Sequence, residues 1–135
     1  MIKLILVLGL TFFISQTFKF VIDSFSMGKL YFWSYLQDGG MPSTHSAVVT
    51  SLTLVVYFNQ GFSLLFFVVF VFSLIILNDA MKVRYETELE AKDLNKVMRK
   101  LHILHKTLNE RVGHKPLQVL AGIMLGFIIS LIFYL

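Results

Sequence analysis

The sequence predicts an all-α polytopic membrane protein with about four transmembrane helices and a cytoplasmic amphipathic helix, and three observations lead to this prediction. First, 56% of the 135 residues are apolar and only 15% are charged, whereas soluble domains carry roughly 25% charge. Second, the mean hydropathy is +0.75, and fourteen phenylalanines cannot all pack inside so small a core. Third, the charges gather in two connections between apolar stretches. The length suits a single domain, residues 1–135, and the composition disfavours a soluble bundle of unusually apolar helices.

Four apolar stretches predict the spans, at about 4–21, 43–58, 62–79 and 116–135. A span needs about 20 residues, within a range of roughly 17–25, so the first and last stretches are long enough. The middle two are short, and Asn59-Gln60-Gly61 between them predicts the tight turn of a helical hairpin. The first stretch resembles a signal peptide, but no small-residue cleavage site follows it, so we expect a retained span.

Two polar connections join these spans. Residues 23–41 mix aromatic side chains with Lys29, which is typical of an interfacial loop at headgroup depth. In the second connection, apolar residues recur every three or four positions over 94–112, which predicts an amphipathic helix at about 85–112. This helix is suited to lie on the membrane or to pack against a second copy as a homodimer. In the last span, Gly122 and Gly126 predict a close helix contact, either within the chain or between copies.

The charge distribution predicts the topology. Eleven of the twelve basic residues lie in the two polar connections or at the span ends beside them. The positive-inside rule assigns that side to the cytoplasm, so we expect a multi-pass protein of the cell (inner) membrane. The net charge of +4 then faces anionic lipid headgroups, and lipids rather than nucleic acid are the expected partners. The chain has no cysteine, which excludes disulfides.

Both prolines of the chain open a span beside a histidine. One lies in Gly39-Gly40-Met41-Pro42-Ser43-Thr44-His45-Ser46, and the other in Gly113-His114-Lys115-Pro116-Leu117. Proline favours the first turn of a helix, and free N–H groups at helix starts favour an anion. Because both starts are expected on the same face, the pattern predicts a phosphate site. Taken singly, Ser43 or Thr44 is equally suited to cap a helix.

One lysine of the first span adds to this pattern. Gln16, Lys19 and Asp23 share one helix face near the expected cytoplasmic end. A lysine at this depth either extends its amine to the interface or faces a polar interior. At the end of the third span, Asp79 is followed five residues later by Arg84, a spacing at which two side chains share an α-helical face poorly.

The chain resembles the divergent branch of the type 2 phosphatidic acid phosphatase superfamily. The resemblance lies in an ordered set of segments: 39–46, Asp79 with 83–84, 108–110 and 113–117. That branch is also described as acid phosphatase/vanadium-dependent haloperoxidase-related membrane proteins. The similarity runs from about Gln16 to Gly126 and so covers most of the chain.

The resemblance implies a role for each matching residue. Lys19, Ser43 and Thr44 would bind phosphate, with Thr44 where glycine is usual. His45 would be the catalytic acid and His114 the nucleophile that forms a phosphohistidine.

Two positions depart from the superfamily pattern. Leu108 stands where its third motif has an arginine, and Gln118 stands where it has the aspartate that orients the nucleophile. Arg84 or Arg111 would then supply the guanidinium, and Asp79 or Gln118 would orient His114. An amide stabilises an imidazolium less well than a carboxylate does.

We expect neither a metal nor another cofactor. His102 and His105 are three positions apart and would need His114 to complete a metal site, but no carboxylate pattern accompanies them. The sequence therefore favours a membrane phosphatase acting on a phosphorylated lipid substrate or prenyl diphosphate at the cytoplasmic face. The alternatives are a lipid-phosphate binding or transport protein without catalysis, and a structural membrane protein whose amphipathic helix recruits a partner.

The predicted topology places both chain termini on the outer side of the membrane. A reporter that is active only outside the cytoplasm should therefore be active when fused at Leu135. Activity there of a reporter that works only in the cytoplasm would contradict the topology.

Overall fold

The computed structural model describes residues 2–103 and 106–134, and Met1, Leu104, His105 and Leu135 lie outside the described residues. All regular structure in the described part is helical, which confirms the predicted all-α class. The elements are α1 (Ile2–Met27), η1 (Phe32–Leu36), α2 (Thr44–Gln60), α3 (Leu64–Asn78), η2 (Asp79–Val83), α4 (Arg84–Lys100) and α5 (Pro116–Tyr134).

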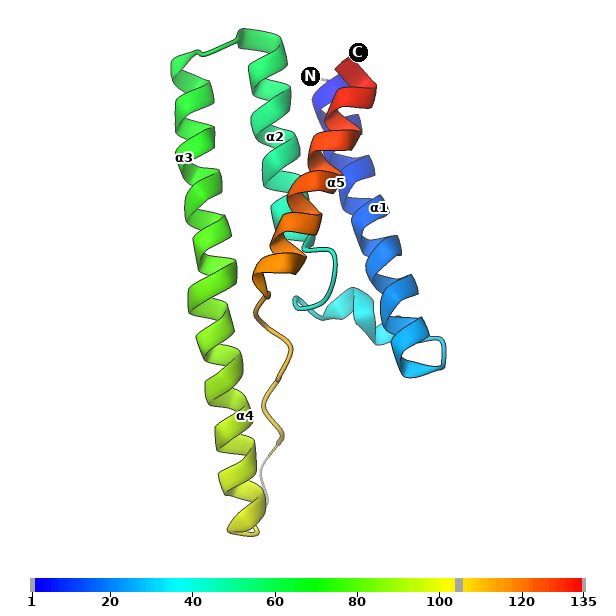
Figure 1. Cartoon of the computed structure of the whole chain (residues 1–135), viewed down its shortest axis with the longest axis vertical. Coiled ribbons are helices and arrows are strands. Elements are labelled where there is room, and N and C mark those ends of the chain that lie inside the picture. Colours follow the sequence, from blue (N-terminus) through cyan, green and yellow to red (C-terminus); the bar gives the residue numbers. More distant parts are fainter. Residues whose placement is uncertain (1, 104–105, 135) are drawn as a thin grey trace.

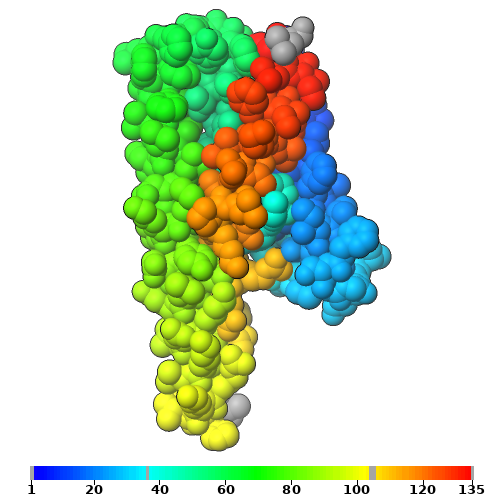
Figure 2. All heavy atoms as spheres, in the orientation of Figure 1, coloured from blue at the N-terminus to red at the C-terminus, as the bar shows by residue number. Residues whose placement is uncertain are grey.

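The helices α1, α2, α3 and α5 form a bundle whose two ends differ (Figure 1). The start of α1, the end of α5 and the α2–α3 turn lie at one end of the bundle. The loop with η1, the start of α2 and the start of α5 lie toward the other end. From there α4 continues α3 and projects well beyond the bundle, as Figure 2 also shows. The two polar connections therefore share one end of the bundle, as the sequence predicts.

Three helices in the described part are long and apolar enough to cross a membrane: α1, the continuous helix that begins with α3, and α5. The fourth predicted span, α2, has 17 residues, which is near the lower limit for a span. It packs against α1, α3 and α5, so neighbouring helices cover much of its surface. Its short length and more polar sequence are tolerated because α2 meets protein more than lipid.

The interior of the bundle is built from small and hydroxyl-bearing side chains. Thr11, Ser51 and Ser130 are fully buried, and the Thr11 and Ser51 hydroxyls lie 2.9 Å apart. Ser51 also donates a hydrogen bond to the Gly126 carbonyl at 3.0 Å. Most of the phenylalanines on α1 and α3 are exposed on the outside instead, which is the arrangement expected of helices surrounded by lipid.

The predicted Gly122 and Gly126 contact lies within the chain, between α5 and α2. A Cβ added at Gly122 would lie 2.3 Å from the Ser43 carbonyl oxygen, and one at Gly126 would lie 2.2 Å from that of Ala47. Only glycine allows the two backbones to approach this closely. The contact fixes the start of α2 against the first turns of α5, which is where the two proline-histidine motifs lie.

The predicted amphipathic helix over 85–112 is wrong beyond Lys100, where α4 ends. The chain turns back there, and the described residues between 101 and 115 return along α4 without helical structure (Figure 1). The Asn95 side chain bonds both the N–H and the carbonyl of Leu108, each at 3.0 Å. These bonds satisfy the Leu108 backbone groups in place of the hydrogen bonds that a continued helix would give them. The spacing of apolar residues, every three or four positions, does not show that the Asn95 side chain competes with helical hydrogen bonds for the Leu108 backbone.

We expect Gly126→Ala to destabilise the bundle by about 1–3 kcal/mol, the usual cost of overpacking, because the added methyl meets the α2 backbone. Gly9→Ala is the matched control, since a Cβ at Gly9 on α1 meets nothing within 4 Å. Thermal unfolding in one detergent would compare the two variants. Equal midpoints for both would contradict the close α2–α5 contact.

Candidate active site

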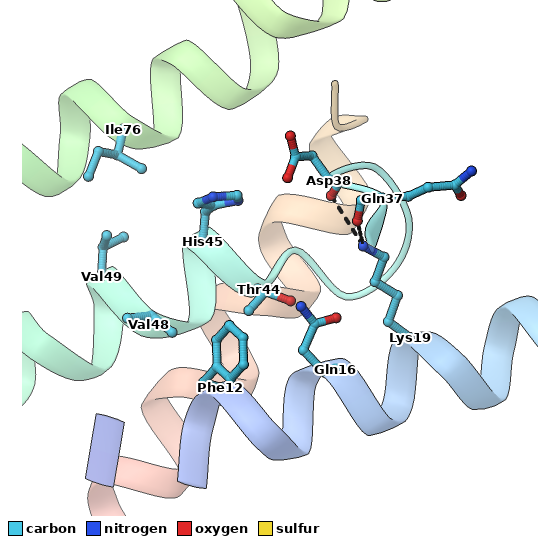
Figure 3. A pocket seen from close by; sticks show the side chains of 10 residues that line it. All are labelled: Phe12, Gln16, Lys19, Gln37, Asp38, Thr44, His45, Val48, Val49 and Ile76. Atoms are coloured by element: carbon cyan, nitrogen blue, oxygen red, sulfur yellow. Dashed lines mark hydrogen bonds between the residues drawn. The ribbon is translucent and has the colours of Figure 1, made fainter. Parts of the chain in front are cut away.

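Three segments meet at the end of the bundle from which α4 projects: the last turns of α1, the loop that leads into α2, and residues 111–115 before α5. A cavity of about 280 Å³ opens between α1, α2 and this loop. Its polar lining includes Gln16, Lys19, Thr44 and His45, and its apolar wall comprises Phe12, Val48, Val49 and Ile76 (Figure 3).

Lys19 faces the protein interior rather than the membrane interface, and its side chain is almost fully buried, with 2% exposed. Its ammonium group donates hydrogen bonds to the carbonyl oxygens of Gln37 and Asp38, the latter at 3.5 Å (Figure 3). The alternative in which Lys19 extends to the interface is therefore wrong. A buried ammonium next to a cavity is suited to bind an anion.

Ser43 and Thr44 lie at the start of α2 but differ in their surroundings. The Ser43 hydroxyl caps the helix by accepting hydrogen bonds from the N–H and the hydroxyl of Ser46, at 3.3 and 2.9 Å. The Thr44 side chain lines the cavity, and its buried hydroxyl has no hydrogen-bond partner. Thr44 is therefore the residue of the pair that is free to contact a ligand.

The two histidines of the proline motifs come together, with ring centroids 6.5 Å apart. The His45 side chain is exposed to the cavity, whereas His114 is 1% exposed. Neither ring nitrogen of His114 has a hydrogen-bond partner. Burial lowers the pKa of His114 below its ordinary value, and the nearby His45 lowers it further, while the neighbouring Gln118 and Gly40 oppose the shift. The net shift favours the neutral ring, the form in which a nitrogen can act as a nucleophile.

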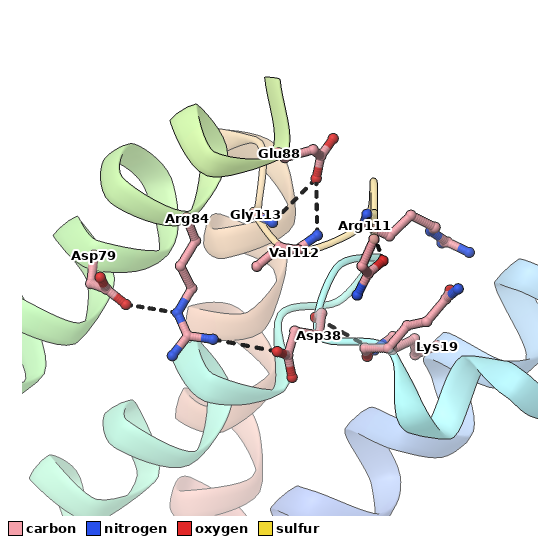
Figure 4. A network of polar contacts seen from close by, with 10 residues as sticks. Lys19, Asp38, Asp79, Arg84, Glu88, Arg111, Val112 and Gly113 are labelled. Atoms are coloured by element: carbon pink, nitrogen blue, oxygen red, sulfur yellow. Dashed lines mark hydrogen bonds and ion pairs between the residues drawn. The ribbon is translucent and has the colours of Figure 1, made fainter. Parts of the chain in front are cut away.

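His114 owes its position to the docking of residues 112–114 on the long helix. The His114 N–H donates to the Ala80 carbonyl at 3.1 Å. The Glu88 carboxylate accepts hydrogen bonds from the N–H groups of Val112 and Gly113, at 3.3 and 3.2 Å (Figure 4). A Cβ at Gly113 would lie 2.4 Å from the Tyr85 Cα, so glycine is needed for this approach.

Asp79 and Arg84 form an ion pair, contrary to the expectation from their spacing. The Arg84 Nε lies 2.7 Å from the Asp79 carboxylate. The residues between them form the π-helical turn η2, in which the Arg84 N–H bonds the Asp79 carbonyl. One such turn spans five residues, so positions five apart come to the same face. The predicted alternative in which Asp79 orients His114 finds no support, because the His114 ring nitrogens have no partner.

Gln118 caps the start of α5. Its side-chain oxygen accepts a hydrogen bond from the Lys115 N–H at 2.9 Å, the geometry of a capping box in which the third helical residue reaches back. The amide lies near enough to His114 to favour its protonated form slightly. A role for Gln118 in orienting the ring stays a prediction.

Two further charged residues belong to the site. Asp38 lines the cavity and pairs with Arg84 Nη1 at 3.5 Å (Figure 4), although its sequence context signals only a turn. Arg111, expected only as an alternative guanidinium, pairs with the buried Asp23 at 2.7 Å. Ser34 donates to the same carboxylate at 2.5 Å, and Arg111 Nη1 is buried without a partner.

Within residues 2–103 and 106–134, no group of three metal-ligating side chains is placed to hold a metal ion. His105, considered above as one ligand, lies outside the described residues, so the expected absence of a metal stays a prediction.

Comparison with known proteins places the chain in a recognised family. Residues 2–129 match the Divergent PAP2 family, which confirms the resemblance drawn from the motifs. The chain is also similar to the protein named uncharacterized membrane protein YuiD from Bacillus subtilis (strain 168). The two are 31% identical over 134 residues, which cover 87% of this chain and 85% of YuiD. No solved structure matches the chain.

Proposed function

Because the chain belongs to the Divergent PAP2 family, we propose that it is a membrane phosphatase that hydrolyses a lipid phosphate or prenyl diphosphate through a phosphohistidine. The observation that carries this proposal is that the ring centroids of His45 and His114 lie 6.5 Å apart, beside a cavity lined by a buried lysine. The two rings come from motifs about seventy residues apart, and neither packing nor capping requires two imidazoles there.

The cavity suits a phosphorylated lipid. Its polar end offers the Lys19 ammonium, the Thr44 hydroxyl and the His45 ring, and its opposite wall is aliphatic and aromatic. A phosphate group at the polar end would leave the hydrophobic tail of the lipid against Phe12, Val49 and Ile76. Phe12 and Ile76 lie on α1 and α3, whose outer surfaces face the membrane. The bilayer would hold the rest of the tail, so the protein needs to recognise little beyond the headgroup.

The proposed reaction has two steps. A neutral ring nitrogen of His114 attacks phosphorus, the bond between phosphorus and the leaving oxygen breaks, and His45 gives that oxygen a proton. Water then attacks the phosphohistidine, His45 takes the proton from the water, and inorganic phosphate leaves. Lys19 and a guanidinium offset the charge of the phosphoryl oxygens in both steps.

A second candidate, a lipid-phosphate binding or transport protein of the same fold, is favoured by one specific observation. Among the described residues no carboxylate orients His114, because Asp79 pairs with Arg84 and the position where the superfamily has the orienting aspartate holds the amide Gln118. Binding at the polar end of the cavity needs no oriented nucleophile.

We place the site on the cytoplasmic side of the cell membrane. In support, the end of the bundle that carries the cavity also carries the long charged projection of α4. Phosphorylated lipids of the cytoplasmic leaflet would then reach the cavity from within their own leaflet.

We expect purified protein in lipid nanodiscs to release phosphate from a panel of lipid phosphates and prenyl diphosphates. His114→Ala should abolish release because it removes the nucleophile, and His45→Ala should slow it by roughly 10²–10⁴-fold because it removes the acid. His102→Asn is the control, since His102 is exposed beyond α4 and adopts a positive φ of 53° that asparagine tolerates.

Binding of the same lipids without release would favour the second candidate. Release that survives His114→Ala at the wild-type rate would contradict the phosphohistidine mechanism.

A further inference from the structure

A groove of about 510 Å³ lies on the outer side of α1, where α1 meets the first polar connection. Its apolar lining comes from Phe20, Val21 and Phe25 in the last turns of α1 and from Leu30 just after them. Of the described residues that line the groove, only Lys29 is charged. The groove therefore offers one cation at the edge of an apolar surface.

The chain reverses direction to form this groove. Gly28 adopts a positive φ of 64°, and the Lys29 N–H donates to the Ser24 carbonyl at 3.2 Å, as in a glycine-terminated helix. The chain then returns along α1 as η1 (Figure 1). The ring of Phe32 in η1 packs against that of Phe20, with centroids 5.2 Å apart. These contacts fix the walls of the groove, so the groove exists without a ligand.

The groove lies at the depth of the lipid headgroups. About 20 helical residues cross the hydrocarbon core, and α1 has 26, so its last turn reaches the polar layer beyond the core. Phe25 is 84% exposed and Leu30 is 71% exposed, and Trp33 in η1 is exposed as well. Tryptophan and large apolar side chains at this depth lie among headgroups and the first acyl carbons. Surrounding lipid is therefore the molecule that covers the groove.

The charge of Lys29 decides which lipid fits best. Among the described residues, no carboxylate forms an ion pair with Lys29. A phosphatidylglycerol headgroup leaves the negative charge of its phosphate uncompensated, whereas a phosphatidylcholine headgroup carries a cation of its own. A basic side chain near the headgroup layer favours the anionic lipid.

We propose that this groove is a binding site for an anionic phospholipid, with the phosphate at Lys29 and one acyl chain along Phe20, Val21 and Phe25. The lipid is a bound ligand and not the substrate, because the groove shares no lining residue with the cavity beside the two histidines.

The lipid site and the candidate active site lie on opposite faces of the same helix turns. Lys19 and Asp23 are buried on the inner face, and the residues of the groove lie on the outer face. Ser34 of η1 donates to the Asp23 carboxylate at 2.5 Å, and that carboxylate pairs with Arg111 at 2.7 Å. A lipid that holds η1 against α1 therefore supports this buried network from outside.

The single tryptophan of the chain, Trp33, allows a direct test by fluorescence quenching. The protein is placed in nanodiscs of equal parts phosphatidylcholine and phosphatidylglycerol, in which one lipid or the other carries bromine near the headgroup end of an acyl chain. Bromine quenches tryptophan only at short range. Brominated phosphatidylglycerol should occupy the groove about threefold to fivefold more often than brominated phosphatidylcholine, the effect of one basic residue, and should quench Trp33 more strongly.

Substitutions of Lys29 separate this site from the general charge of the protein. In Lys29→Gln, the two brominated lipids should quench Trp33 equally, and Lys29→Arg should keep the preference. Lys82→Gln is the matched control, because Lys82 is also exposed and lies in η2, away from the groove. It removes the same charge and should leave the preference unchanged.

Equal quenching of the wild type by the two lipids would overturn the proposal. A preference that survives Lys29→Gln, or that Lys82→Gln lowers as much as Lys29→Gln does, would also overturn it, because the preference would then follow net charge. The measurement requires no turnover, so its outcome does not depend on the proposed phosphatase activity.

Discussion

The docking of residues 112–114 against the π-helical turn and the first turns of α4 is the contact on which the rest of the site depends. The Ala80 carbonyl and the Glu88 carboxylate hold three consecutive backbone N–H groups, and the missing side chain of Gly113 lets the two backbones meet. The same π-helical turn brings Asp79 to Arg84. One irregular turn in a long helix thus positions both His114, the proposed nucleophile, and the Arg84 guanidinium, which fits the frequent occurrence of such turns at functional sites.

The bundle supports this arrangement by separating its two kinds of surface. Small side chains and hydroxyls lie between the helices, and the glycines of α5 meet the α2 backbone, so the starts of α2 and α5 are fixed relative to each other. Large apolar side chains face outward, where lipid surrounds them. The cavity lies where these surfaces meet the polar end of the bundle. A phosphorylated lipid has the same division between polar head and apolar tail, which is why the proposed substrate fits the place as well as the chemistry.

Much of the fold and part of the site could be predicted from the sequence, for identifiable reasons. Apolar length and charge asymmetry report directly on the membrane, and Pro42 and Pro116 each mark a helix start beside a histidine, so the meeting of His45 and His114 followed from local signals. The end of α4 at Lys100 could not be predicted, because it depends on Asn95 bonding a segment thirteen residues away. The Asp79–Arg84 pair was missed because spacing rules assume α-helical geometry, and Asp38 was missed because its partner Arg84 is forty-six residues distant.

The central claim of the proposed function is that His114, positioned by the docking of residues 112–114 on the long helix, carries the phosphoryl group. The most direct measurement is mass spectrometry of the protein after rapid mixing with a lipid phosphate that it hydrolyses. The reaction is stopped with alkali, which preserves phosphohistidine. The account predicts one phosphoryl group on the peptide that contains His114. A phosphoryl group on His45 instead, or turnover in which rapid quenching traps no phosphorylated protein at any time, would contradict it.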